Sequence, residues 1–364
     1  MDRATLANWR TPPFNRWAFH HVRELIPTAE IRNDSTKVRA LPSAPVDVVE
    51  RKFLDETATD AMVVLHRGKK VFEHYAGGMD AQTPHILMSV SKSMLGLLAG
   101  ILAAEKTLDL DKPVTHYVPE VEPTAYRGAT VRHLLDMRTG IEWDENYLAT
   151  SGPIVEYRQA TGWNPTEKPS DLLSFYQKLK AGRAHGGKTD YISPNTDLLG
   201  IVVERATKRR YADLMSELLW KPVGAATPAY VTVDRLGAAR AAGGMCVTAE
   251  DLARVGQALV EGRVVPPSWV DDIETQGSRE AWEAGTLAPY FEGLPITYRS
   301  KWYVLNEAPK LAFGFGIHGQ NLFVDRKNAI VIAKLSSQPQ PMDAKLIAGA
   351  VRTAARICAA LTRP

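Results

Sequence analysis

Hydrophobic and polar residues near the start of the chain are arranged in a way that predicts a β-hairpin. Two apolar stretches, 61–66 and 71–75, flank a turn at Gly68, and Gly77-Gly78 ends the pattern. Short β-rich runs bounded by glycine turns are typical of paired strands. We therefore expect an antiparallel sheet to begin here.

The following segment, 89–104, reads SVSKSMLGLLAGILAA and is apolar almost all round. This pattern predicts a helix that is buried on every side, not an amphipathic surface helix. A polar group near the start of such a helix needs a reason, because burial of an unpaired charge is costly.

The rest of the chain is predicted to be helical in its middle and β-rich in its last third. Helical patterns broken by Gly, Pro and polar loops lie at 131–137, 169–179, 196–206 and 211–219. Strand patterns and a long closing helix follow at 301–305, 321–325, 329–335 and 342–361. We infer an α+β fold, with an antiparallel sheet flanked by helices and a mostly α-helical inserted domain.

Three parts are expected along the chain. Residues 1–45, rich in Pro, Arg and Trp, are predicted to form an N-terminal arm over the main body. Residues 46–110 and 240–364 are expected to form one α/β domain, and 111–239 a mostly helical domain. A cleft between these two domains is the expected place for a binding site.

Composition narrows the range of partners. The 364 residues are 45% hydrophobic, enough for a large core, and the net charge of +3 comes from 44 basic and 41 acidic residues without a block of like charge. Nucleic acid is therefore not expected as a partner. No stretch resembles a signal peptide or a membrane span, which predicts a cytoplasmic protein without a membrane partner. A homodimer stays open.

No cofactor or metal is expected. The two cysteines, Cys246 and Cys358, are too few and too far apart for a disulfide framework or a thiolate metal site. The histidines show no compact ligand spacing. The run Gly314–Gly319 fits Gly-x-Gly-x-x-Gly, but a predicted strand follows it instead of the helix that a dinucleotide site requires.

A serine and a lysine at the start of the buried helix are the main candidates for chemistry. Ser89 and Lys92 are three positions apart, so on a helix their side chains lie on one face. A serine hydroxyl needs a base, and an amine can act as that base when burial lowers its pKa. The helix start also directs N–H groups toward a developing oxyanion. By itself this spacing is common.

A tyrosine precedes a later helix. Tyr191 lies in the run Asp190–Gly200 (DYISPNTDLLG). A phenol near a lysine ammonium is drawn toward phenolate and can relay protons between nucleophile and leaving group. The alternative is a half-buried tyrosine that packs a loop.

Taken together, these motifs resemble those of the serine β-lactamases and D-Ala-D-Ala peptidases, a group that includes family VIII esterases and 6-aminohexanoate-dimer hydrolases. The Ser-x-x-Lys motif is known from that group. The segments 130–140 (TVRHLLDMRTG) and 199–224 are also similar to it, and the resemblance spans most of the chain. It implies a serine hydrolase that works through an acyl-enzyme.

Two departures from this family separate the chain from its β-lactamases. Ser193 stands where the class C pattern Tyr-x-Asn has asparagine, and Asn195 lies two positions further on. Both are therefore candidate substrate-binding residues. The Lys-Thr-Gly motif corresponds to a segment around Gly314–Gln320 that lacks the basic residue. The resemblance then implies weak β-lactamase activity and favours the 6-aminohexanoate-dimer hydrolase and esterase branch.

In that branch a strand N–H completes the oxyanion hole. The resemblance places it at Ile317, opposite the N–H of Ser89. The register is open by about a residue, and His318 either faces the cleft as a substrate-binding residue or is a strand histidine with a satisfied neighbour.

A loop rich in acids and aromatics, 142–147 (EWDENY), borders the cleft in the resembling hydrolases. Tyr147 is a candidate to hydrogen-bond a substrate amide, and the acids are candidates to receive a substrate amine. A solvated loop with a packed tryptophan is the alternative, and Tyr157, Arg158 and Trp163 share this ambiguity.

We therefore expect a serine hydrolase that cleaves a small linear amide or ester, with Ser89, Lys92 and Tyr191 as catalytic residues. The alternatives are a carboxylesterase, a D-Ala-D-Ala-peptidase-like enzyme with weak β-lactamase activity, and a non-catalytic ligand-binding module of the same fold.

Overall fold

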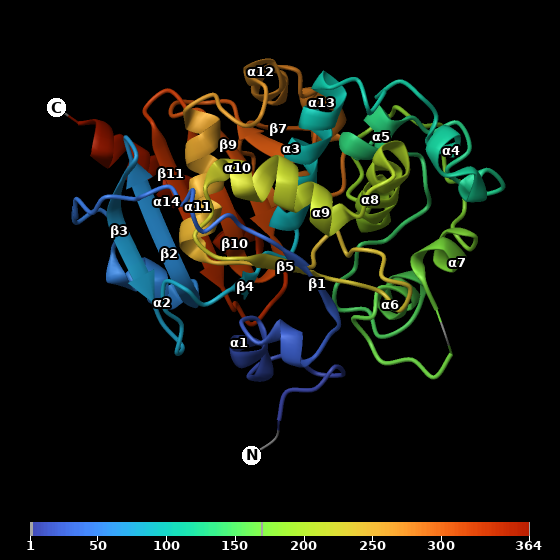
Figure 1. Cartoon of the computed structure of the whole chain (residues 1–364), viewed down its shortest axis with the longest axis horizontal. Helices are drawn as coiled ribbons and strands as arrows, with labels where there is room; N and C mark the ends of the chain where they lie inside the picture. The colour runs from blue at the N-terminus through green and yellow to red at the C-terminus, as the bar shows by residue number, and fades with distance from the viewer. Residues whose placement is uncertain (1–2, 169, 364) are drawn as a thin grey trace.

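A seven-stranded antiparallel sheet, built from both ends of the chain, forms the centre of this computed structural model, which describes residues 3–168 and 170–363 (Figure 1). Its strands follow the order β3-β2-β11-β10-β9-β8-β7. Their bounds are β2 (Thr59–His66), β3 (Lys69–Tyr75), β7 (Ile296–Arg299), β8 (Trp302–Leu305), β9 (Leu311–Gly316), β10 (Gln320–Asp325) and β11 (Ile330–Ser336). The predicted hairpin is confirmed as β2 and β3.

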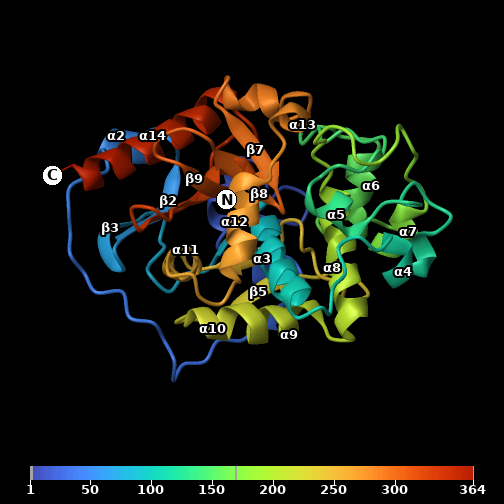
Figure 2. The same cartoon turned by 90° about the horizontal axis from the view of Figure 1, so that it is seen from above.

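Helices cover both faces of this sheet (Figure 2). The side chains of β2 alternate between the two faces, since Val63 packs in one hydrophobic cluster and Val64 in another. The first face is covered by α3 (Val90–Ala104) and α11 (Ala249–Val260). Helix α12 (Pro267–Thr275) packs against the end of the sheet formed by β7 and β8. The second face is covered by α14 (Ala344–Thr362) and α2 (Arg51–Glu56). Because both faces are buried, β2 and β11 are apolar along most of their length.

A second, four-stranded sheet has the order β1-β5-β6-β4. Its strands are β1 (Thr28–Ile31), β4 (His85–Ile86), β5 (Ala229–Thr232) and β6 (Met245–Val247). These strands are too short to give a clear alternation, and the sequence did not predict this sheet. Through β1, the N-terminal arm pairs with β5 and is thus fixed to the body of the protein.

Short helices lie in a group beside the main sheet (Figures 1 and 2). They are α4 (Val114–Tyr117), α5 (Val131–Leu135), α6 (Pro153–Ala160), α7 (Leu172–Tyr176) and α8 (Ser193–Thr207). The remaining helices and helical turns are α1 (Phe14–Ala18), η1 (Val22–Glu24), η2 (Pro119–Val121), α9 (Tyr211–Met215), η3 (Ser216–Trp220), α10 (Lys221–Val223), α13 (Arg279–Glu283), η4 (Ala288–Phe291) and η5 (Ile317–Gly319). The expected domain limits stay a prediction. Positions 1, 2, 169 and 364, which fall within the expected domains, lie outside the described residues.

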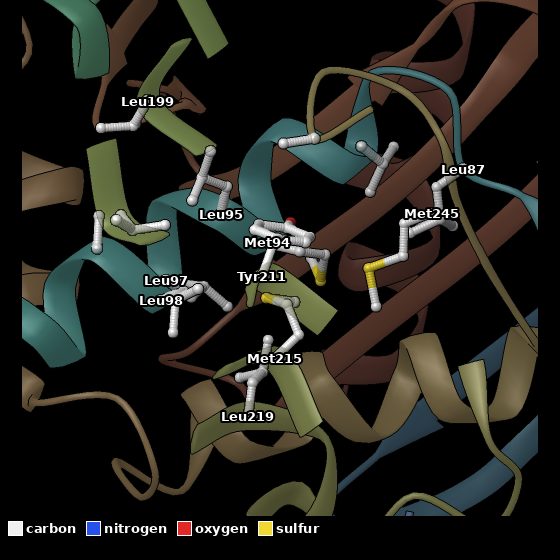
Figure 3. Packing of buried hydrophobic residues seen from close by; sticks show 14 of the residues in the cluster. Leu87, Met94, Leu95, Leu97, Leu98, Leu199, Tyr211, Met215, Leu219 and Met245 are labelled. Carbon is white, nitrogen blue, oxygen red and sulfur yellow. The ribbon is translucent and has the colours of Figure 1, made fainter. Parts of the chain in front are cut away.

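Helix α3 is buried on all sides, as its sequence predicts. Figure 3 shows its leucines and Met94 between residues of α8, α9 and β6. Two glycines allow the helix to pack this closely: a Cβ on Gly96 would lie 2.2 Å from the carbonyl oxygen of Ser300, and one on Gly100 would lie 2.4 Å from the Trp269 ring. The packing fixes the start of α3, where the candidate nucleophile lies.

Within the described residues, no helix is long and apolar enough to cross a membrane. The same residues contain no group of three or more His, Cys, Asp or Glu side chains that would hold a metal ion.

Candidate active site

Ser89 and Lys92 meet at the start of α3. Ser89 is the residue before the first helical turn, and the Lys92 amine donates a hydrogen bond of 2.8 Å to the Ser89 hydroxyl oxygen. The preceding residue, Met88, has a left-handed φ of 45°, which bends the chain sharply into the helix. The predicted placement of a hydroxyl and an amine on one helix face is therefore present in the structure.

The surroundings of Lys92 lower the pKa of its amine to about 7. Burial is the main cause, since only 1% of the residue is exposed, and the nearby Arg240 adds to it; the carboxylates Glu145 and Asp197 act in the opposite direction. The amine also donates to the carbonyl oxygen of Ala242 at 2.7 Å. At neutral pH a large fraction of Lys92 is thus uncharged and able to accept a proton.

Tyr191 lies on the loop before α8 and is buried beside both residues. Its ring centroid is 4.9 Å from the Lys92 nitrogen, and its backbone N–H donates to Thr286. Burial raises the pKa of Tyr191, and contacts with the hydroxyls of Ser89 and Tyr303 offset this only in part. The expected shift toward phenolate is therefore wrong, because desolvation outweighs the contacts that favour phenolate. The phenol keeps its proton at neutral pH.

A buried ion pair holds the backbone that binds Lys92. The Asp197 carboxylate, fully buried in α8, accepts hydrogen bonds from the Arg240 guanidinium, from the Tyr157 hydroxyl at 2.6 Å and from the Ala242 N–H at 2.7 Å. Because the Ala242 carbonyl accepts from Lys92, this network fixes the direction in which the lysine amine points. The sequence motifs alone did not predict this network.

The end of β9 passes directly beside Ser89. A Cβ on Gly316 would lie 3.0 Å from the backbone nitrogen of Ser89 and 2.7 Å from the carbonyl oxygen of Leu87, so only glycine permits this approach. The next residue is Ile317, the predicted second oxyanion donor, at the start of the η5 turn. The structure therefore brings the backbone of Ile317 next to that of Ser89.

The packing around Gly314 explains why β9 has no basic residue at this position. A Cβ on Gly314 would lie 2.9 Å from the Ser93 hydroxyl and 3.1 Å from a Val90 methyl group, because β9 packs against α3 here. A lysine at this position would therefore press against the side chains of Ser93 and Val90. The strand thus offers no cation where the Lys-Thr-Gly motif would place one.

His318 follows Ile317 with a left-handed φ of 62° and is buried. Its Nδ1 lies 2.7 Å from the carbonyl oxygen of Gln338, and its ring packs edge-on against Phe19 of the arm. Burial lowers the pKa of His318 to about 4, so the ring is neutral. Of the two interpretations left open, the histidine with a satisfied neighbour describes this geometry.

Glu145 links the 142–147 loop to α8. Its carboxylate accepts hydrogen bonds from the backbone N–H and the hydroxyl of Ser193 and from the indole of Trp143. Ser193 therefore positions Glu145, and its hydroxyl is already engaged. Tyr147 is half-buried, and burial together with the nearby Glu145 raises the pKa of its hydroxyl.

Asn195 does not reach the cleft, which corrects the expectation that it binds substrate. The side chain is fully buried; its amide donates to the Thr139 hydroxyl at 2.8 Å, and its carbonyl oxygen accepts from the Tyr126 hydroxyl at 3.1 Å. Since α8 starts at Ser193, a residue two positions into the helix faces the helical group instead of the nucleophile.

A cavity of about 400 Å³ opens beside Tyr191. Three acidic residues line it, Asp144, Glu145 and Asp190, and so do the hydroxyl-bearing rings of Tyr147 and Tyr290. Asp190 is paired with Arg183 at 2.8 Å and Lys188 at 3.1 Å. This acidic cavity suits a substrate with an apolar chain and a positively charged end.

Comparisons with known proteins agree with this geometry. A family model described as Beta-lactamase matches residues 46–356. A 6-aminohexanoate-dimer hydrolase of Paenarthrobacter ureafaciens is 37% identical over 352 residues, which cover 93% of this chain and 89% of that protein. Esterase EstB of Burkholderia gladioli is 28% identical over 196 residues, 51% of this chain and 49% of the esterase.

Among solved structures, a Bacillus anthracis protein of inferred 6-aminohexanoate-dimer hydrolase activity aligns with a TM-score of 0.88 at 26% identity. The alignment covers 100% of both chains. The N-terminal arm is therefore part of the shared fold and not an addition to it.

Proposed function

Since this chain belongs to the β-lactamase family and is a serine hydrolase of amides or esters, we propose that Ser89 is its nucleophile and that a short linear amide is its preferred substrate. The observation that carries this proposal is the 2.8 Å hydrogen bond between the Lys92 amine and the Ser89 hydroxyl, in surroundings that lower the pKa of Lys92 to about 7. A nucleophile and its base are thus already in contact.

The first half of the reaction forms an acyl-enzyme. Neutral Lys92 accepts the Ser89 proton while the serine oxygen attacks the carbonyl carbon of the substrate. The backbone N–H groups of Ser89 and Ile317 donate to the resulting oxyanion. Tyr191 gives its proton to the leaving nitrogen as the carbon–nitrogen bond breaks, and the Lys92 ammonium returns a proton to Tyr191.

The second half regenerates the enzyme. Neutral Lys92 accepts a proton from water, the hydroxide attacks the acyl carbon, and the bond to the Ser89 oxygen breaks as that oxygen regains a proton. Tyr191 is important for amides in particular, because an amine leaves only after protonation whereas an alkoxide or phenoxide leaves more readily. Its raised pKa keeps the phenol protonated for this step.

The acidic cavity and the 6-aminohexanoate-dimer hydrolase relative support the proposed substrate class. The Paenarthrobacter ureafaciens protein is named for hydrolysis of the 6-aminohexanoate dimer, which as a linear amide has a free amine at one end and a free carboxylate at the other. Leu287 and Tyr290 offer apolar surface to a methylene chain, and Asp144 and Glu145 attract an ammonium group. A carboxylesterase is the second candidate, because EstB is a relative over half of this chain.

Labelling with a fluorophosphonate tests the nucleophile. We expect the wild-type protein and an exposed-site control, Ser35→Ala, to gain one adduct by intact-protein mass spectrometry, and Ser89→Ala to gain none while it melts at a similar temperature. An adduct on Ser89→Ala, or none on the wild type, would overturn the assignment.

Turnover of three substrates tests the class. We expect hydrolysis of the linear 6-aminohexanoate dimer and of p-nitrophenyl butyrate, with nitrocefin slower than either because Gly314 leaves no cation on β9. Cleavage of the ester without the amide would make the enzyme a carboxylesterase. Nitrocefin as the best substrate would contradict the proposal.

A further inference from the structure

A second cavity, of about 450 Å³, adjoins the acidic cavity and shares Tyr147, Leu148 and Pro341 with it as lining residues. Its walls are the N-terminal arm, the 147–150 segment and the 339–341 segment, and it extends to Ile317. The acidic cavity extends to Tyr191. Tyr191 and Ile317 both adjoin Ser89, so each cavity extends to a different neighbour of the nucleophile.

The N-terminal arm supplies an arginine to this second cavity. Trp9 is buried against Phe19 and Trp163, and its indole donates to the Trp163 carbonyl at 3.1 Å, which fixes the arm in place. The next residue, Arg10, lines the cavity, with its guanidinium 5.3 Å from the centroid of the Trp9 ring. The arm therefore holds a cation at a defined position.

The charge of Arg10 is not neutralised within the described part of the chain. One terminal nitrogen donates to the side-chain oxygen of Asn164, while the Nε is buried and has no hydrogen-bond partner there. No carboxylate among the described residues lies within 4.0 Å of the guanidinium. A buried donor without an acceptor is costly, so a ligand with an anionic oxygen would satisfy it.

Arg158 adds a second positive charge to the same cavity. Only 7% of the residue is exposed, and its guanidinium donates to the carbonyl oxygens of Tyr147 at 2.9 Å and Ala149 at 3.4 Å. It too has no carboxylate within 4.0 Å among the residues described. Burial and the neighbouring Arg158 and Arg240 lower the pKa of Arg10 to about 9, which reflects the excess of positive charge.

We propose that this arginine-lined cavity binds a carboxylate of the substrate, with Arg10 as the binding residue and Arg158 shaping the wall. This inference rests on the proposed function and deepens it, because it assigns a binding site to the carboxylate end of a linear amide whose other end is an amine. The acidic cavity would then receive the ammonium end and the basic cavity the carboxylate end, with the scissile bond at Ser89 between them.

Inhibition of ester hydrolysis tests the basic cavity without an amide substrate. With p-nitrophenyl acetate as the reporter, we expect hexanoate to inhibit the wild type competitively and the uncharged hexanamide to inhibit it at least about ten times more weakly. Arg10→Gln should raise the Ki of hexanoate about tenfold and leave that of hexanamide unchanged. The control Arg3→Gln removes an exposed charge from the same arm and should leave both Ki values as they are.

A second variant covers the case in which Arg10→Gln fails to fold. Asn164→Asp places a carboxylate next to Arg10 with almost no change in shape, and should weaken hexanoate inhibition in the same way. Equal Ki values for hexanoate in the wild type and both variants would overturn the inference. If the enzyme cleaves esters but no linear amide, the amide part of the proposed function fails, and the Ki ratio still decides the inference.

Discussion

The pH dependence of turnover gives a direct test of the role of Lys92. The lysine must be uncharged to accept the Ser89 proton, and its pKa is about 7 instead of 10.5. The uncharged fraction then rises from about 9% at pH 6 to about 91% at pH 8, so kcat/KM should rise about tenfold over this interval. A lysine with an ordinary pKa would instead give a profile that still rises above pH 9.

A charge change near the lysine should move this profile in a known direction. Burial is the main cause of the low pKa of Lys92, and Glu145 is the largest of the influences that raise it. Glu145→Gln should therefore lower the pKa further and shift the rise in kcat/KM to lower pH. The glutamine oxygen can still accept from the Ser193 N–H, which limits the effect on structure.

Initial rates with p-nitrophenyl butyrate between pH 5 and 9.5 measure the profile, with Glu142→Gln as the matched control on an exposed acid of the same loop. The control should keep the wild-type midpoint. A profile that is flat between pH 6 and 8, or a midpoint that moves upward in Glu145→Gln, would refute the assignment of Lys92 as the base.

Two further predictions concern the buried charges. Lys92→Met should abolish acylation, yet raise the free energy of unfolding by about 2 kcal/mol at pH 7 once the two lost hydrogen bonds are included. Between pH 7 and 10.5 the unfolded wild type binds more protons than the folded one, so the stability of the wild type rises with pH in that window. Denaturant titrations at pH 7 and 9.5 should therefore show a smaller gain in stability for Lys92→Met at the higher pH. Asp197→Asn should reduce kcat at least about tenfold and destabilise the fold by about 3–5 kcal/mol, since it leaves the Arg240 charge buried and unpaired; a wild-type melting temperature would contradict this.

The sequence predicts the elements with strong periodicity and the catalytic pair. The hairpin 61–75 and the buried helix 89–104 are present, and the spacing of Ser89 and Lys92 has only one geometric result on a helix. The expectation of α+β layers is also confirmed. In each case the information is local, because a period of two or 3.6 residues specifies which side chains share a face.

The rest of the site depends on contacts between distant segments. Nothing near Arg10 in the sequence indicates a cavity that also contains Arg158 and Ile317, and Ala242 has no side chain to suggest a hydrogen bond to Lys92. One signal was available: Asp197 is the only charged residue in the buried run 193–203, and a charge in such a run requires a partner. That partner, Arg240, is recognisable only in the folded chain.

The prediction that Asn195 binds substrate was wrong for a related reason. Motif spacing counts residues along the chain, whereas a side chain's direction depends on where the helix begins. Because α8 begins at Ser193, Ser193 points to Glu145 and Asn195 points into the helical group, toward Thr139. A shift of two residues on a helix turns a side chain by about 200°, which is enough to remove it from the cleft.

The distribution of charge around Ser89 links these observations. Lys92 is about half charged at pH 7, while the acidic cavity extends to Tyr191 and the arginine-lined cavity to Ile317. A linear amide with an amine at one end and a carboxylate at the other fits this arrangement in one orientation only, because the reverse orientation brings like charges together at both ends. Its scissile carbonyl would then meet the N–H groups of Ser89 and Ile317 in a single orientation. The same two cavities that hold the substrate therefore also fix the position of the leaving nitrogen, which accepts the proton of Tyr191.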